Sequence, residues 1–198
     1  MAVSIEDIRK LNELTGVGLT GAKEALTEAE GDFDKALEAM RKKGLTKAEK
    51  KADREAREGI IDSYVHGGRI GVLVEVNCET DFVARTDGFK EFAHNISLQI
   101  ASMAPEYISE EDIPTEEIER VKQEALTSDA LKGKPADIAD KIVDGQVKKH
   151  FADKVLLNQA YIMDDSQTVG EYLKENVAKT GENIVIRQFK RIELGVNE

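Results

Sequence analysis

The chain has 198 residues and a formal net charge of −11, with 28 Lys and Arg against 39 Asp and Glu. This charge argues against binding to bulk nucleic acid or to an anionic membrane surface, because both require a surplus of basic side chains. Hydrophobic residues make up 40% of the chain, which is enough for a packed core and argues against general disorder. The length corresponds to one or two domains.

Cysteine and histidine are too few and too scattered for a metal site or a disulfide. Cys78 is the only cysteine, and His66, His94 and His150 are isolated in sequence. The N-terminal residues lack the apolar run of a signal peptide, and no apolar stretch approaches the roughly 20 residues that a membrane span needs. We therefore expect a soluble, cytoplasmic protein with no metal and no cofactor.

Residues 1–45 carry apolar side chains at helical spacing in three short runs. Ser4 suits the N-cap of the first helix, Asp32 suits the N-cap of the third, and Gly44 is placed to end it. The pattern predicts a small three-helix module. The motif G-x-G-x-x-G at 16–21 follows a helical segment and not a strand, so we interpret it as a turn between helices and not as a dinucleotide site.

Residues 46–58 consist almost entirely of charged residues and alanine, with Ala48, Ala52 and Ala56 four residues apart. This pattern predicts a charged linker helix. The wider segment 41–58 has eight basic and four acidic residues, a net charge of +4. It could contact RNA, but no aromatic side chain is available there for stacking on bases, so we favour a solvated linker.

Residues 59–198 predict an α/β core. Alternating apolar residues indicate a hairpin of strands 60–66 and 70–77 around a two-residue Gly67-Gly68 turn, followed by an amphipathic helix from Thr86 or Asp87. A polar helical excursion over about 105–158 comes next, with Pro114 and Pro135 at expected helix starts. The chain then returns to the core through three further elements, namely a strand at 159–163, a helix from Thr168 to Gly181 and a strand at 183–193.

The whole pattern predicts an α+β fold. It combines the three-helix bundle, the charged linker helix and a core with a three- to four-stranded, mainly antiparallel sheet packed by helices. No internal repeat at the scale of 20–50 residues is evident.

The segment 80–85 lies where a buried strand passes into a helix, a place from which side chains can be displayed on a rigid base. Thr80 or Asp81 can cap a short helical turn. The pattern alone favours a core position for Phe82, whereas an exposed Phe82 would suit insertion into a partner protein. The three histidines read as surface residues, and Cys78 reads as a buried, inert thiol.

Several motifs resemble the family of bacterial elongation factor Ts, in that family's order along nearly the whole chain. The segment Leu14–Gly18 with Lys23, Ala25 and Leu26 is similar to its N-terminal signature, and Gly71–Arg85 is similar to its long second signature. Further similar segments are Gly133–Pro135, Lys141–Gly145 and Asn183–Phe189.

The resemblance implies a guanine nucleotide exchange factor that binds elongation factor Tu, in its GDP-bound and nucleotide-free forms, and promotes GDP release during translation elongation. The three-helix module would resemble a ubiquitin-associated domain and dock on the GTPase domain of that partner. The residues implied to disturb the Mg²⁺ site of the partner are Thr80, Asp81, Phe82 and Val83. Possible partner contacts are Lys23, Lys51, Val17, Gly18 and Leu19.

The resemblance also implies a homodimer, because the length matches the short form of the family. No catalytic acid, base or nucleophile is required for exchange, so we expect a protein that is not an enzyme. Two alternatives remain at the level of sequence. One is a helical-bundle adaptor or chaperone-like module that binds proteins without exchange activity. The other is an enzyme, for which the sequence offers only diffuse carboxylates.

Overall fold

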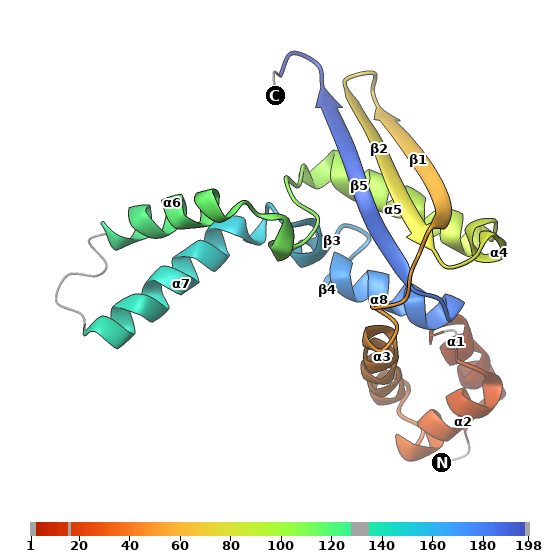
Figure 1. Ribbon diagram of the computed structural model, residues 1–198. Helices are drawn as coiled ribbons and strands as arrows, with labels where there is room; N and C mark the ends of the chain where they lie inside the picture. The colour runs from red at the N-terminus through yellow and green to blue at the C-terminus, as the bar shows by residue number, and fades with distance from the viewer. Residues whose placement is uncertain (1–2, 16, 128–134, 197–198) are drawn as a thin grey trace. The chain divides into compact units, whose positions relative to one another are not determined.

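The computed structural model describes residues 3–15, 17–127 and 135–196, as an α+β fold with three N-terminal helices followed by an antiparallel sheet and further helices (Figure 1). The helices are α1 Ile5–Thr15, α2 Leu19–Glu28, α3 Phe33–Glu49, α4 Asp81–Ala84, α5 Asp87–Met103, α6 Thr115–Leu126, α7 Ala136–Ala152 and α8 Val169–Thr180. The strands are β1 Glu58–His66, β2 Ile70–Cys78, β3 Ala160–Tyr161, β4 Asp164–Thr168 and β5 Ile184–Glu193. Met1–Ser97 and Glu171–Glu198 form one compact unit, and Leu98–Gly170 form another.

The first unit begins with the predicted three-helix bundle. Leu11, Ala22, Ala25, Leu26 and Ala36 form its buried core, with partly buried side chains from α1, α3 and the connecting segments around them. The predicted N-cap of α3 is confirmed, because the carboxylate of Asp32 accepts a hydrogen bond of 3.1 Å from the backbone N–H of Lys35. Most core side chains are small, so the helices pack closely.

The predicted end of the third helix at Gly44 is wrong, and so is the separate charged linker helix over 46–58. Helix α3 continues through Gly44 to Glu49, and the segment from Lys50 to Arg57 contains a turn but no helix. A Cβ atom at Gly44 would lie 3.4 Å from the Cβ of Ala178 in α8. Helices α3 and α8 therefore lie close together at Gly44, with just enough space for a methyl group, and a glycine inside a helix costs about 1 kcal/mol in helix propensity.

The main sheet has three antiparallel strands in the order β1-β2-β5. Gly67 and Gly68 form the predicted turn with φ of 55° and 69°, and the N–H of Arg69 donates to the carbonyl of His66 at 2.9 Å. The strand pair nearest the turn is His66 with Ile70, so the loop between the strands has three residues and not the two that were predicted. The two positive φ angles explain why glycine occupies both central positions.

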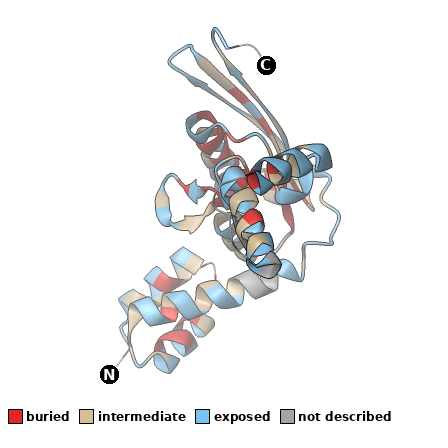
Figure 2. Ribbon diagram, turned by 90° about the vertical axis from the view of Figure 1, so that its left-hand side faces the viewer, coloured by how far each residue is buried: buried red, intermediate tan, exposed pale blue. Residues whose placement is uncertain are grey.

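The two faces of the sheet have different surroundings. Val72, Val74 and Val76 of β2 are buried on one face, and α5, which contributes buried Phe89 and Phe92, lies behind the sheet in Figure 1. On the other face, Ile61, Val65, Leu73 and Ile192 are exposed, and pale blue segments mark the strands near the hairpin turn (Figure 2). The predicted separation into an apolar and a mixed face is confirmed.

The second unit contains the predicted helical excursion. Helices α6 and α7 pack around buried Ile113, Val121, Phe151 and Val155. Pro114 and Pro135 stand at the N-caps of α6 and α7, as predicted. The predicted strand at 159–163 is only two residues long, and it pairs with β4 in a separate two-stranded sheet and not with the main sheet.

Strand β4 was not predicted, because its sequence Asp-Asp-Ser-Gln-Thr carries no apolar residue. A strand of this kind leaves no alternation of apolar and polar residues for sequence analysis to detect. The remaining elements of the core are confirmed: α8 ends before Gly181, which has a φ of 77°, and β5 runs to Glu193.

Candidate functional site

Phe82 is displayed on the surface, on a single helical turn that directly follows the central strand. Helix α4 begins after Thr80, whose hydroxyl oxygen accepts a hydrogen bond of 3.4 Å from the N–H of Val83. Phe82 is 78% exposed, whereas Ala84 of the same turn is buried. The core position favoured by the pattern alone is therefore wrong, because a one-turn helix buries one side and α4 buries the side of Ala84.

The residues beside Phe82 give this turn a defined local structure. Asp81 forms an ion pair with Arg85 across one helical turn, at 2.8 Å between oxygen and nitrogen. Val83, the residue after Phe82, is half-buried. Large exposed aromatic side chains on ordered backbone are typical of the central contacts of protein interfaces.

Cys78 lies beneath the turn and is fully buried, as predicted. Its Sγ donates a hydrogen bond of 3.1 Å to the carbonyl of Thr80. Burial, with a smaller contribution from the nearby carboxylate of Glu182, raises the pKa of the Cys78 thiol to about 11. The thiol therefore stays protonated at neutral pH, acts as a donor, and is poorly nucleophilic.

A second group of candidate residues lies at the start of α2. Leu19 is 55% exposed and Lys23, one helical turn later, is also exposed, so the two form one surface strip. Gly18 is the N-cap of α2, and Val17 packs partly against the bundle core while its carbonyl accepts a hydrogen bond from the side chain of Asn12. The predicted turn between helices is confirmed for Val17 and Gly18 only, because the following residues 19–21 belong to α2. Gly18 has a φ of −59°, so the expected need for glycine conformational freedom is wrong there, and Gly16 lies outside the described residues.

Lys51 lies elsewhere, in the turn that follows α3. Its ammonium group donates a hydrogen bond to the carbonyl of Gly181, at the C-terminal end of α8. A cation is favoured there, because the last carbonyls of a helix carry partial negative charge. The next residue, Glu182, accepts hydrogen bonds from Thr80. Adjacent residues of one loop therefore bind Lys51 and the start of the turn that carries Phe82.

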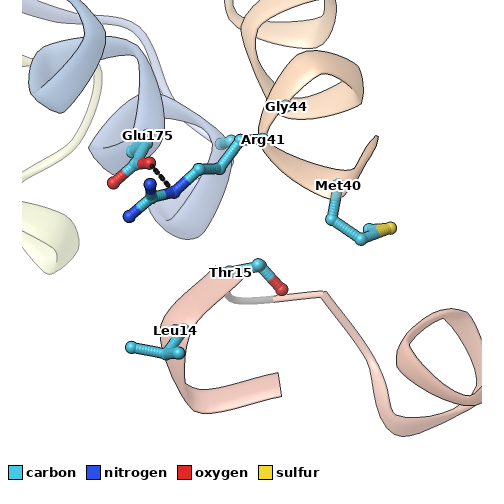
Figure 3. Close-up of a pocket in the computed structure, with 7 residues that line it drawn as sticks. Leu14, Thr15, Met40, Arg41, Gly44 and Glu175 are labelled. Atoms are coloured by element: carbon cyan, nitrogen blue, oxygen red, sulfur yellow. Dashed lines mark ion pairs between the residues drawn. The ribbon is translucent and has the colours of Figure 1, made fainter. Parts of the chain in front are cut away.

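The helical bundle is also attached to α8 by an ion pair. Arg41 Nε lies 2.9 Å from Glu175 Oε1, and the Glu175 side chain is 15% exposed. Figure 3 shows Arg41 reaching from α3 to Glu175, beside a hollow that Leu14, Thr15 and Met40 also line. The hollow has a volume of about 20 Å³, which suits a water molecule and not a substrate.

The three histidines lie at the surface, and His94 Nδ1 is 3.3 Å from a carboxylate oxygen of Asp62. His66, His94 and His150 are exposed, as predicted. Within residues 3–15, 17–127 and 135–196, no group of three His, Cys, Asp or Glu side chains could hold a metal ion. Over the same residues, no helix is long and apolar enough to cross a bilayer.

Comparison with known proteins places these residues in a family. A family model described as elongation factor TS matches residues 9–196. The elongation factor Ts of Coprothermobacter proteolyticus is 51% identical over 196 residues, which cover 98% of this chain and 100% of the relative. That of Thermotoga neapolitana is 52% identical, with 98% of each chain covered. The chain therefore belongs to the elongation factor Ts family of translation factors.

Proposed function

We propose that this protein is the nucleotide exchange factor of elongation factor Tu, and that Phe82 enters the partner and disturbs its Mg²⁺ and phosphate site. The observation that supports this best is the 78% exposure of Phe82 on a turn anchored at both ends. Thr80, Asp81 and Val83 shape the turn. Membership of the elongation factor Ts family supports the identity of the partner.

The proposed mechanism requires binding energy and no covalent chemistry. Mg²⁺ bridges phosphate oxygens of a bound nucleotide and neutralises their charge, so loss of its coordination weakens GDP binding. A factor that binds the nucleotide-free GTPase more tightly than the GDP form must lower GDP affinity by the same factor. The protein is on this proposal not an enzyme in the usual sense, and GTP displaces it by mass action.

The strip on α2 supports a second area of contact with the same partner. Leu19 and Lys23 are exposed there, with Val17 and Gly18 at its start. Lys51 is a further proposed contact, although its ammonium group also holds the carbonyl of Gly181. On this proposal α2 supplies affinity, and the turn that carries Phe82 supplies the exchange activity.

The direct test is release of fluorescent GDP from elongation factor Tu in the presence of catalytic amounts of this protein. We expect Phe82→Ala to lower the acceleration by about thirtyfold or more, which corresponds to a residue that dominates an interface. Met163→Ala is the matched control, since Met163 is also a large exposed apolar side chain, at 57%. Unchanged kinetics in Phe82→Ala would reject its proposed role, and a wild-type protein without effect on release would favour the adaptor alternative.

We also propose that a second copy of the chain covers the exposed face of the main sheet. Ile61, Val65, Leu73 and Ile192 lie on that face, and they are 72%, 67%, 54% and 70% exposed. Adjacent apolar side chains on one sheet face are typical of an interface.

Sedimentation tests this homodimer. Leu73→Lys places a charge on the proposed interface without disturbing the buried face, so we expect it to shift the protein to monomer at micromolar concentration. Wild-type protein that sediments as a monomer at that concentration, with full exchange activity, would contradict the proposal.

A further inference from the structure

The turn that carries Phe82 is held by a side chain about one hundred residues away in sequence. Glu182 lies in the loop between α8 and β5 and is half-buried. One carboxylate oxygen accepts hydrogen bonds from the N–H of Glu79 at 3.1 Å and from the N–H of Thr80 at 3.0 Å. The other oxygen accepts a bond of 2.7 Å from the hydroxyl of Thr80. A single carboxylate thus binds three donors at the entrance to α4.

The contact is reciprocal, because the side chain of Glu79 binds back to the same loop. Glu79 Oε1 accepts a hydrogen bond of 2.7 Å from the N–H of Asn183, and it lies 3.5 Å from Arg54 Nη1. The buried amide of Asn183 donates to the carbonyls of Ala52 and Arg54 at 3.1 and 2.7 Å. Three chain segments are therefore joined at this point, and we name them the clasp: 52–54, 79–80 and 182–183.

Thr80 transmits the effect of the clasp to Phe82. Its hydroxyl group donates to Glu182 and accepts from the N–H of Val83, so Glu182 selects the rotamer in which Thr80 caps α4. A four-residue helix has too few internal hydrogen bonds to be stable without such anchors. The direction of the exposed Phe82 side chain then depends on the position of Thr80.

We propose that Glu182 is the positioning residue for Phe82, which it orients through Thr80 without contact with the partner. This inference rests on the exchange function proposed above and goes beyond it, since it assigns part of the activity to a loop outside the 80–83 segment. Charge-assisted hydrogen bonds to a fixed carboxylate hold geometry more strongly than neutral ones. A positioned Phe82 enters the partner without first being ordered.

The test compares the full-length protein with Glu182→Ala, Glu182→Gln, Phe82→Ala and the double variant Glu182→Ala/Phe82→Ala. Glu91→Ala is the control, because Glu91 is an exposed glutamate on α5. GDP release from elongation factor Tu is measured over a range of factor concentrations. Amide hydrogen exchange at Glu79 and Thr80 is measured in the absence of the partner.

We expect Glu182→Ala to lower the maximal release rate by about tenfold, while the half-saturating concentration changes by less than about threefold. Glu182→Gln keeps an acceptor and regains part of the rate. In the Phe82→Ala background, Glu182→Ala should lower the rate by less than about twofold, because the two residues act through one contact. In the Glu182→Ala variant, the rate of amide hydrogen exchange at Glu79 and Thr80 should rise by at least about tenfold over the wild type.

Two results would overturn the positioning role. One is a normal maximal rate in Glu182→Ala, and the other is an effect of Glu182→Ala that is equally large with and without Phe82. If Phe82→Ala alone leaves release unchanged, the exchange role of Phe82 fails. Amide hydrogen exchange then tests separately whether Glu182 positions the turn. Unchanged protection of the Glu79 and Thr80 amides in Glu182→Ala would overturn this positioning role.

Discussion

Two phenylalanines of the same unit should respond in opposite ways to truncation. Phe82 is 78% exposed, and Phe89, seven residues later, is 1% exposed beneath the sheet. Full burial of a phenylalanine side chain contributes about 1.5–3 kcal/mol, so the small buried part of Phe82 contributes less than about 0.7 kcal/mol. Truncation of Phe89 removes its transfer free energy and leaves a cavity, which together cost about 3–5 kcal/mol.

Urea unfolding followed by circular dichroism measures this difference. We expect the urea midpoint of Phe82→Ala to be nearly the same as that of the wild-type protein. We expect Phe89→Ala to lower the free energy of unfolding by about 3 kcal/mol or more, with an m-value similar to that of the wild type. In thermal unfolding, this loss of stability in Phe89→Ala corresponds to a fall in Tm of about 6–12 °C for a protein of this size. All variants are compared at one protomer concentration, because dimerisation contributes to stability.

The result that would refute this reasoning is a similar loss of stability in both variants. It would mean that Phe82 is buried in the free protein, and that its loss affects exchange through the fold. A stable Phe82→Ala protein with reduced exchange would instead separate the function of this residue from the stability of the chain.

Two further predictions concern glycine geometry and alkaline pH. A Cβ atom at Gly59 would lie 2.1 Å from the carbonyl oxygen of Val76, and Gly59 has a φ of 151°; we therefore expect Gly59→Ala to lower the free energy of unfolding by about 3 kcal/mol or more. Gly71→Ala, with open space around its Cβ, is the control in the same sheet, and an equal effect of both in urea unfolding would contradict the steric argument. The raised pKa of Cys78, about 11, means that the unfolded chain loses this proton first as pH rises, so stability should fall between about pH 9 and pH 11. Urea midpoints at pH 8 and pH 10 should show a smaller decrease for Cys78→Ala than for the wild type, and an equal decrease would be inconsistent with a buried thiol.

The elements with strong local signals were predicted correctly from sequence. Asp32 has the side chain that an N-cap requires, Gly67 and Gly68 tolerate the positive φ of the hairpin turn, and Pro114 suits a helix start. Alternation along β2 identified its buried face. Each of these signals depends on residues a few positions apart, which is the range over which backbone preferences act.

The errors arose where contacts between elements, and not the preferences of one segment, decided the structure. Glycine is typical of a helix end, but Gly44 lies against Ala178 of α8 and α3 continues past it. Strand β4 lacks apolar residues, and its partner β3 alone makes it a strand. The apolar periodicity of one segment does not report these contacts, because it shows which face of that segment can be buried and not which other element it meets.

The sequence by itself determined that this protein has a three-helix bundle, a β-hairpin and an α/β core, and its motifs indicated the elongation factor Ts family. Only the tertiary structure decided that Phe82 faces solvent and that Glu182 holds the start of the turn that carries Phe82. The reason is physical: apolar periodicity shows that a side chain can be buried, but the packing of α4 against the rest of the unit decides which side of that turn is covered.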